Sequence, residues 1–475
     1  MLIKRKFFID GKWIDPAQKN DLEVLNPTNA QPIAVISMGQ SQDMELAIEA
    51  AKKAFQSYSQ TSIEERLTLL ERLLKIYERR YDEMVQTITL ELGAPVTMST
   101  EQQAHTGLGH LEGFIAGLRQ IKTRETLPNG DIICREPIGV CGLITPWNWP
   151  INQIALKVIP ALATGCTCVL KPSEQTPLNA MLFAEMIEEA GFPAGSFNLV
   201  NGDGISAGAV LSKHKDVDMV SFTGSTKAGI SISKSATDTI KRVTLELGGK
   251  SPNIIFDDAD IEASIVRGVQ TCFLNSGQSC DAPTRMLIQQ SVYEKATLIA
   301  KSAAEAVLVG MPNEEGDHIG PLVSQVQFER VQDMIKKGIT EGANLLVGGI
   351  GKPAGFEAGY FAKPTVFSNV TNEMNIAREE IFGPVLVLIP FADEQQAIEI
   401  ANDTDYGLAA YIETNDINRA ERVATRLRVG MVHINGGPHR YGSPFGGYKY
   451  SGVGREGGVP GLEDFLEIKT LHYPD

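Results

Sequence analysis

From Ile138 onward, apolar β-prone runs alternate with segments of helical periodicity, and this alternation constrains the fold more than any other sequence feature. The first series covers residues 139–145, 154–163, 167–170, 178–190 and 197–200. A second series covers residues 254–256, 261–275, 286–288, 293–307 and 385–390. Strands separated by helices of this length predict βαβ units and parallel sheets. We therefore expect an α/β protein with two α/β layers.

The residues before this alternation predict short strands followed by two helices. Asp10-Gly11 lies between apolar and aromatic residues, which favours a tight hairpin turn within residues 7–14. Residues 43–58 place their apolar side chains on one helical face. Ser62-x-x-Glu65 has the pattern of a capping box and predicts the start of a second helix.

The size and charge of the chain limit its organisation and its partners. Its 475 residues exceed what one compact core usually carries, so two or more domains are expected. The 43 Lys and Arg residues against 58 Asp and Glu give a net charge of −15, which makes nucleic acid an unsuitable partner. No stretch approaches membrane-spanning length, so no membrane association is expected.

The cysteines and the N-terminus bear on the compartment. The apolar stretch after Lys4, Arg5 and Lys6 is too short for a secretory signal. The six cysteines are scattered, which favours reduced thiols and a cytoplasmic location. Cys166 and Cys168 have no second ligand pair, so we expect no metal site.

Two segments carry groups suited to covalent catalysis. Cys280 ends a polar, glycine-containing segment that follows an expected helix, and a bend there could expose its thiol. Glu246 interrupts an apolar strand-like run before Gly248-Gly249-Lys250, and a buried carboxylate with a raised pKa could act as a general base. Local reasoning equally allows a buried structural cysteine and a strand-end Glu that caps a turn or pairs with Lys250.

Three further segments have the composition of ligand-binding turns. The run Phe222-Thr223-Gly224-Ser225 could open a helix whose N–H groups hold a pyrophosphate, although it is not the G-x-G-x-x-G fingerprint. Residues 171–174, Lys-Pro-Ser-Glu, follow a strand, where ligands of open α/β sheets collect. Asn148 lies between two tryptophans and two prolines, which suits a preorganised amide donor. An ordinary surface or core turn is the alternative in each case.

Taken together, these segments resemble the aldehyde dehydrogenase superfamily. The matching motifs occur in the expected order and span nearly the whole chain: Pro-Trp-Asn at 146–148, Lys-Pro-Ser-Glu at 171–174, Phe-Thr-Gly-Ser at 222–225, Leu-Glu-Leu-Gly-Gly-Lys at 245–250, Gly-Gln-x-Cys at 277–280 and Glu-Glu-Ile-Phe-Gly-Pro at 379–384. The segments 277–285 and 431–436 look most like a bacterial catabolic branch that oxidises semialdehydes and apolar aldehydes.

The resemblance implies a mechanism and a fold. By similarity, Cys280 attacks the aldehyde, and the Asn148 amide and the Cys280 backbone N–H hold the oxyanion. Hydride then leaves for NAD, with NADP possible, and Glu246 activates the water that hydrolyses the thioester. The resemblance further implies a Rossmann-like parallel-sheet NAD-binding domain, a second α/β catalytic domain and a small β oligomerisation arm. The implied product is a carboxylic acid.

The resemblance also assigns cofactor contacts. Glu174, matched to a position that holds the adenosine ribose, favours NAD because a carboxylate repels the 2′-phosphate of NADP. Glu380 and Phe382 match positions at the nicotinamide ribose. The remaining implied contacts are Ile144, Thr145, Pro146, Trp147, Lys171, Ser173, Gly204, Gly208, Phe222, Gly224, Ser225 and Leu247.

Departures from the family pattern concern the substrate. Leu156 replaces an aromatic residue of several relatives, which removes part of a box for betaine-type cations. Asp281 follows the nucleophile directly and would raise the pKa of the thiol if it faces the sulfur, whereas it would change nothing if it points away. Asn152 and Gln153 match tunnel positions and could receive an oxo or carboxylate group.

The implied domains are discontinuous, and the implied assembly is a homodimer or a tetramer of dimers. Residues 1–118 and 138–247 would bind NAD, 248–450 would form the catalytic domain, and 119–137 with 451–475 would form the oligomerisation arm. Three rival hypotheses remain: a CoA-acylating relative, a binding protein without turnover and a cysteine hydrolase. Glu246 argues against the first, the intact Cys280, Glu246 and Asn148 against the second, and the lack of a His near Cys280 against the third.

Overall fold

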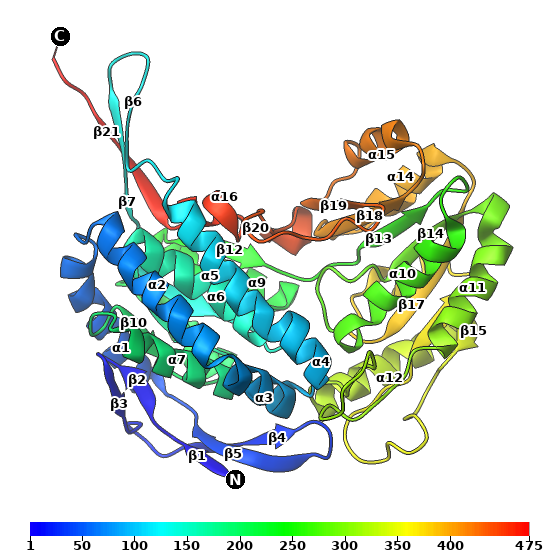
Figure 1. Cartoon of the computed structure of the whole chain (residues 1–475), viewed down its shortest axis with the longest axis horizontal. Coiled ribbons are helices and arrows are strands. Elements are labelled where there is room, and N and C mark those ends of the chain that lie inside the picture. The colour runs from blue at the N-terminus through cyan, green and yellow to red at the C-terminus, as the bar shows by residue number, and fades with distance from the viewer. Residues whose placement is uncertain (475) are drawn as a thin grey trace.

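The computed structural model describes residues 1–474 and contains two α/β bodies and a projecting arm (Figure 1). The first body is built on an eight-stranded sheet. Its order is β20 (Gly452–Val453), β12 (Arg242–Glu246), β11 (Met219–Thr223), β8 (Val140–Ile144), β9 (Thr167–Lys171), β10 (Phe197–Leu199), β2 (Phe7–Ile9) and β3 (Lys12–Ile14). The five strands from β12 to β10 run parallel, as the alternating pattern predicts.

Helices cover both faces of this sheet because its strands are apolar on both sides. On one face α1 (Ser41–Tyr58) and α8 (Ala209–Lys213) pack against Val169 and Val220, and α9 (Thr226–Ala236) lies alongside. The opposite face carries α2 (Ile63–Arg79), α5 (Ala104–Leu118), α6 (Pro150–Thr164) and α7 (Leu178–Ala190), which bury Cys168 and Leu170. Alternate residues of β9 therefore belong to two different cores.

The second body has a seven-stranded sheet with only one antiparallel strand, β15. Its order is β15 (Asn344–Val347), β16 (Thr365–Ser368), β17 (Val385–Phe391), β14 (Arg285–Gln289), β13 (Pro252–Ile255), β18 (Ala409–Glu413) and β19 (Met431–Ile434). One face packs on α10 (Ile261–Phe273) and α11 (Tyr293–Glu305), and the other packs on α12 (Gln325–Thr340), α14 (Glu394–Asn402) and α15 (Ile417–Ala424). The expected α/β class with two layers is confirmed.

Smaller elements complete the chain. The arm is a three-stranded antiparallel sheet of β6 (Arg124–Thr126), β7 (Ile132–Pro137) and β21 (Leu466–Leu471), which projects from the first body near the C-terminus (Figure 1). A second small sheet contains β1 (Leu2–Lys4), β5 (Gln31–Ser37) and β4 (Asp21–Asn26). The remaining helices are α3 (Tyr81–Leu92), α4 (Val96–Met98), α13 (Asn375–Arg378) and α16 (Gly458–Glu463).

The local predictions for the N-terminal region are confirmed. β2 and β3 pair antiparallel, and Asp10 and Gly11 adopt φ values of 51° and 71°, the left-handed geometry of a tight hairpin. Ser62 Oγ accepts a hydrogen bond from Glu65 N, while Glu65 Oε2 accepts one from Ser62 N at 2.7 Å, so the capping box starts α2. None of the helices in residues 1–474 is long and apolar enough to cross a membrane.

Candidate active site

Parallel strand order brings the predicted binding segments together. β8, β9, β11 and β12 run in the same direction, so their carboxyl ends meet at one edge of the sheet. The segments that follow them begin at Thr145, Pro172, Gly224 and Leu247. Ligands of parallel sheets bind at this edge because the loops there leave a crevice and the helix N-termini point toward it.

The nucleophile candidate Cys280 follows a sharp bend after α10. Asn275, Ser276 and Gly277 all have positive φ values, of 53°, 56° and 72°. A Cβ on Gly277 would lie 2.1 Å from Gly383 O, so only glycine fits at this close approach. Gln278 is fixed on both sides, since its Oε1 accepts from Val323 N at 3.0 Å and its Nε2 donates to Asn275 O at 3.0 Å. The loop therefore holds Cys280 rigidly away from the helix.

Burial and nearby carboxylates raise the pKa of the Cys280 thiol well above its usual value. Burial is the largest cause, followed by the negative charge of Asp281 and then by Glu380 and Glu246. The charge of Asp281 therefore contributes to raising the pKa of the thiol. The thiol is kept protonated at neutral pH until a ligand or a base offsets these effects.

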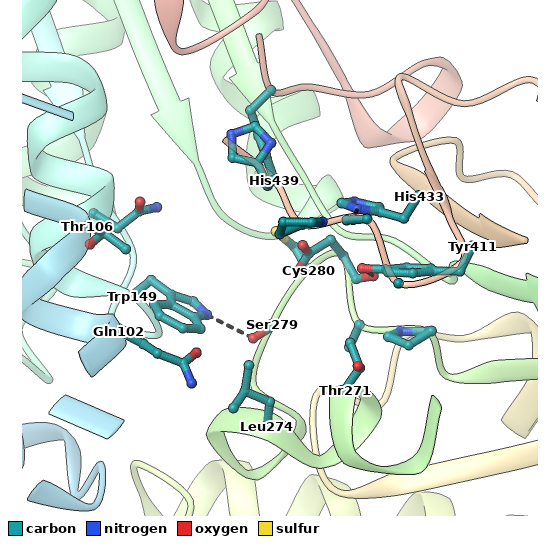
Figure 2. A pocket seen from close by; sticks show the side chains of 18 of the residues that line it. Gln102, Thr106, Trp149, Thr271, Leu274, Ser279, Cys280, Tyr411, His433 and His439 are labelled. Carbon is teal, nitrogen blue, oxygen red and sulfur yellow. Dashed lines mark hydrogen bonds between the residues drawn. The ribbon is translucent and has the colours of Figure 1, made fainter. Parts of the chain in front are cut away.

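Asn148 is held beside the nucleophile by its backbone and its side chain. The backbone oxygen of Asn148 accepts from Gln103 Nε2 at 3.1 Å and from Asn275 Nδ2 at 2.8 Å. Its Nδ2 donates to Gln278 O at 3.0 Å, which occupies one of the two amide hydrogens. Next to it, Trp149 Nε1 donates to Ser279 Oγ at 2.8 Å (Figure 2). The second amide hydrogen of Asn148 is left to hold developing negative charge.

Glu246 is the last residue of β12 and is buried, with 3% of its surface exposed. Neither carboxylate oxygen has a hydrogen-bond partner among the described residues, so the expected alternative of pairing with Lys250 is wrong. Burial is the main cause that raises its pKa well above the usual value, and the charge of Glu456 adds to the effect. A buried carboxylate of raised pKa without a partner has the properties of a general base.

A buried ion pair of Lys157 and Glu456 lies close enough to act on Glu246, and sequence reasoning missed it. Lys157 Nζ also donates to Thr223 Oγ1 at 2.6 Å. The charge of Lys157 lowers the pKa of Glu246 and so opposes the effect of Glu456. The available signal was a single Lys inside the apolar helical run at residues 154–163.

A cluster of predicted cofactor contacts, called the cradle below, lies beside the carboxyl ends of β8 and β9. Lys171 Nζ donates to Pro172 O at 2.8 Å and to Gly202 O at 2.9 Å, and it lies 3.7 Å from a carboxylate oxygen of Glu174. A Cβ added to Gly204 would meet nothing within 4 Å, so this surface is open. The predicted residues gathered here are Ile144, Thr145, Lys171, Ser173, Glu174, Gly204 and Gly208.

A cavity of about 170 Å³ extends from this edge of the sheet to Cys280. Gly224 and Ser225 open α9, with Ser225 Oγ capping the helix by accepting from Ala228 N at 3.3 Å. Glu380 Oε1 accepts from Gly249 N at 3.1 Å across the cavity. The predicted residues that line it are Pro146, Trp147, Asn148, Gly224, Ser225, Glu246, Leu247, Cys280, Glu380 and Phe382.

Phe222, the first residue of the predicted Phe-Thr-Gly-Ser segment, does not line this cavity. Phe222 lies inside β11 and packs in the core beneath Gly224. A Cβ added to Gly224 would lie 2.5 Å from the Phe222 ring. Trp147 and Phe382 line the cavity and meet edge to face with ring centroids 5.4 Å apart. Phe382 has a positive φ of 62°, and Gln327 Nε2 donates to its carbonyl at 2.7 Å.

A second, larger cavity of about 460 Å³ also reaches Cys280. Gln102, Thr106 and Trp149 form one wall, while Tyr411 and His433 form the opposite wall around Cys280 (Figure 2). The rings of Tyr411 and His433 stack with centroids 4.6 Å apart. Most of the accessible lining is apolar or aromatic, and Leu156, Asn152, Gln153 and Asp281 all belong to it.

No group of three or more His, Cys, Asp or Glu side chains within residues 1–474 is arranged to hold a metal ion. The side chains gathered around Cys280 include the Asn148 amide and the Glu246 carboxylate.

Comparison with known proteins agrees with this geometry. Residues 13–471 match the model of the aldehyde dehydrogenase family. The chain is 51% identical over 468 residues, 98% of each chain, to a 3-succinoylsemialdehyde-pyridine dehydrogenase from a Pseudomonas species. Among solved structures, an aldehyde dehydrogenase from Bartonella henselae superposes with a TM-score of 0.98 at 53% identity over 100% of both chains.

A second solved structure is informative about ligands. It is a mutant of aldehyde dehydrogenase C from Pseudomonas syringae in complex with NAD+ and octanal, with a TM-score of 0.97 and 45% identity. The match covers 98% of this chain and 96% of that one. The chain therefore belongs to the aldehyde dehydrogenase family and is an NAD(P)-dependent oxidoreductase that acts on aldehydes through a cysteine thioester.

Proposed function

We propose that Cys280 is the nucleophile, Asn148 the oxyanion donor and Glu246 the general base of this reaction. The observation that carries the proposal is that Cys280 lines both cavities, so a ligand in each cavity can reach it. The apolar cavity suits the aldehyde, and the smaller one, which holds Glu246 and Asn148, suits the nicotinamide end of the cofactor.

The proposed chemistry balances over two half-reactions. The Cys280 thiol gives its proton to solvent and adds as a thiolate to the aldehyde carbon, and the resulting oxyanion is held by Asn148 Nδ2 and by the Cys280 backbone N–H. NAD, when bound, supplies the hydride acceptor, and loss of hydride leaves a thioester on Cys280. Glu246 then takes a proton from water, whose oxygen attacks the thioester, and the Cys280 thiolate leaves as the carboxylic acid is released.

The cradle fits a dinucleotide. The capped N-terminus of α9 and the open surface at Gly204 offer backbone N–H groups to a pyrophosphate. Lys171 is buried, and its partner Glu174 is one-third exposed and free to accept ribose hydroxyls. We expect NAD to be preferred to NADP because the Glu174 carboxylate repels a 2′-phosphate. Phe222 packs beneath Gly224 and so fixes the backbone there without contacting the cofactor itself.

For the substrate we propose an aldehyde with an apolar or aromatic tail, as in the bacterial catabolic branch. The cavity walls of Trp149, Tyr411 and His433 suit such a tail. The related Pseudomonas enzyme is named for a pyridine semialdehyde, and the P. syringae enzyme was crystallised with octanal. Small-molecule aldehydes of these two kinds are the first substrates to test.

The domain division and the assembly also remain proposals. Residues 1–118 with 138–247, residues 248–450, and residues 119–137 with 451–475 would form the NAD-binding domain, the catalytic domain and the arm. The projecting sheet of β6, β7 and β21 supports pairing with a second copy, since Ile468 on β21 is 65% exposed. We expect a homodimer or a tetramer in solution, and a cytoplasmic location based on the scattered cysteines.

The test is an aldehyde panel with NAD or NADP, followed by NADH absorbance, on the wild-type protein and the Cys280→Ala variant. The wild type should form NADH with at least one aliphatic or aromatic aldehyde, and the variant should form none while still binding NAD by calorimetry. An active Cys280→Ala variant would remove Cys280 from the nucleophile role.

A further inference from the structure

A hydrogen bond between α5 and α6 orients one amide of the substrate cavity. His110 Nε2 lies 2.7 Å from Asn152 Oδ1. His110 is buried, and this burial lowers its pKa to about 4, so the imidazole is neutral at physiological pH. The amide oxygen can only accept, so Nε2 carries the hydrogen and His110 is the donor in this contact.

The same contact leaves the amide nitrogen of Asn152 free. Asn152 lines the substrate cavity, and no hydrogen bond within residues 1–474 uses its Nδ2. Asn152 lies in the first turn of α6, directly after the segment that carries Asn148 and Trp149. The cavity that contains the nucleophile therefore also contains a fixed N–H donor, which can meet a substrate tail.

The charged side chains in the cavity lining are mostly acidic. Apart from its histidines, the acidic and basic side chains in the lining are Asp281, Glu101, Glu413 and Arg267. Arg267 pairs with Glu413, with NH2 2.5 Å from Oε2. Asp281 and Glu101 have no ion-pair partner among residues 1–474. The cavity thus offers a neutral donor but an excess of negative charge.

We infer that the cavity selects aldehydes whose tail carries a neutral hydrogen-bond acceptor, such as a ketone oxygen, and disfavours aldehydes whose tail carries a carboxylate. Asn152 is the specificity-determining donor, His110 the positioning residue that orients it, and Asp281 the residue that repels the carboxylate. The inference rests on the aldehyde oxidation proposed above. It narrows the earlier expectation that Asn152 could receive either an oxo or a carboxylate group.

Three substrates of matched length test this selection by kcat/KM: pentanal, 4-oxopentanal and 4-oxobutanoate. The wild type should prefer 4-oxopentanal to pentanal by at least about 5-fold, the worth of one net hydrogen bond. A carboxylate within about 12 Å of Asp281 should be disfavoured about 10-fold at an effective dielectric constant of about 20. Turnover of none of the three would contradict the proposed function, whereas turnover of pentanal without a keto preference would contradict only this inference.

Variants assign the effects to residues. Asn152→Leu and His110→Phe should both bring the ratio of 4-oxopentanal to pentanal close to 1 while pentanal itself is still oxidised. Thr106→Val is the matched control, because Thr106 lines the same wall but its hydroxyl donates to Gln103 O at 2.7 Å within its own helix. This control should keep the ratio of the wild type. A keto preference that survives Asn152→Leu would overturn the role of Asn152.

The charge effect is tested with Asp281→Asn. The ratio of 4-oxobutanoate to pentanal should rise about 10-fold, and taking the ratio removes any general effect of the substitution on the Cys280 thiol. The rise should shrink at high salt, because a partly exposed charge is screened. An unchanged ratio would show that Asp281 does not exclude carboxylates.

Discussion

Replacing Glu246 by Gln should separate the two half-reactions. Neither Glu246 oxygen has a hydrogen-bond partner within residues 1–474, so the nearly isosteric amide breaks no hydrogen bond of the protein. Asn148, Cys280 and both cavities keep their geometry, and hydride transfer needs no proton from position 246. We therefore expect the first turnover to be retained and thioester hydrolysis to become rate-limiting.

The size of the effect follows from the setting of Glu246. A positioned general base contributes about 10²- to 10⁴-fold, and its efficiency is greatest when its pKa lies near the working pH. Burial and the charge of Glu456 raise the pKa of Glu246 well above the usual carboxyl range, which makes the carboxylate a stronger base. A loss of about 10³-fold corresponds to about 4 kcal/mol in the barrier to hydrolysis.

Stopped-flow NADH absorbance measures both quantities. Glu246→Gln should give a burst of about one NADH per active site, followed by a steady state about 10³-fold slower than that of the wild type. The control is Glu467→Gln, the same change on an exposed carboxylate that pairs with Arg242 at the other end of β12. Wild-type turnover in Glu246→Gln, or loss of the burst, would refute the division of labour.

Three further outcomes follow from the structure. Asn148→Ala should lower kcat by about 10²- to 10³-fold in steady-state assays, since it removes one oxyanion donor; a smaller effect would assign the oxyanion to backbone groups. Asp281→Asn should lower the pKa of the Cys280 thiol, because the charge of Asp281 raises it. The pH profile of iodoacetamide labelling should therefore move to lower pH, and an unmoved profile would contradict this charge effect. Arg285→Leu should reduce the free energy of unfolding by about 3–6 kcal/mol in urea titrations. The reason is that the buried guanidinium donates hydrogen bonds to Lys250 O, Ile400 O and Ala401 O. A loss below about 1 kcal/mol would show that these carbonyls find other donors.

Much of the fold could be predicted because local periodicity determines it. The expected helix at residues 178–190 coincides with α7, whose apolar face is continuous and whose end is fixed by Gly191 in the left-handed conformation. The expected strand at 167–170 extends by one residue to Lys171. In these segments the pattern of apolar residues and the residues at the element ends predict the same boundaries.

The site was less accessible to local reasoning. Taken alone, Cys280 fits a buried structural cysteine and Glu246 fits a strand-end carboxylate, and only the ordered motifs together favour catalytic roles. The bend before Cys280 uses Asn275 and Ser276 with positive φ, a conformation that non-glycine side chains rarely adopt and that no propensity predicts. Lys157 and Glu456 are 299 residues apart, so only the folded chain reveals their pairing.

The covalent intermediate on Cys280 is the central claim and can be measured directly. Glu246→Gln is mixed with NAD and an aldehyde, quenched in acid and digested for mass spectrometry. The peptide that contains Cys280 should gain the mass of the aldehyde minus two hydrogens, the signature of a thioester, and no adduct should form without NAD or in Cys280→Ala. An adduct on another residue, or NADH formation without any adduct on Cys280, would contradict the account.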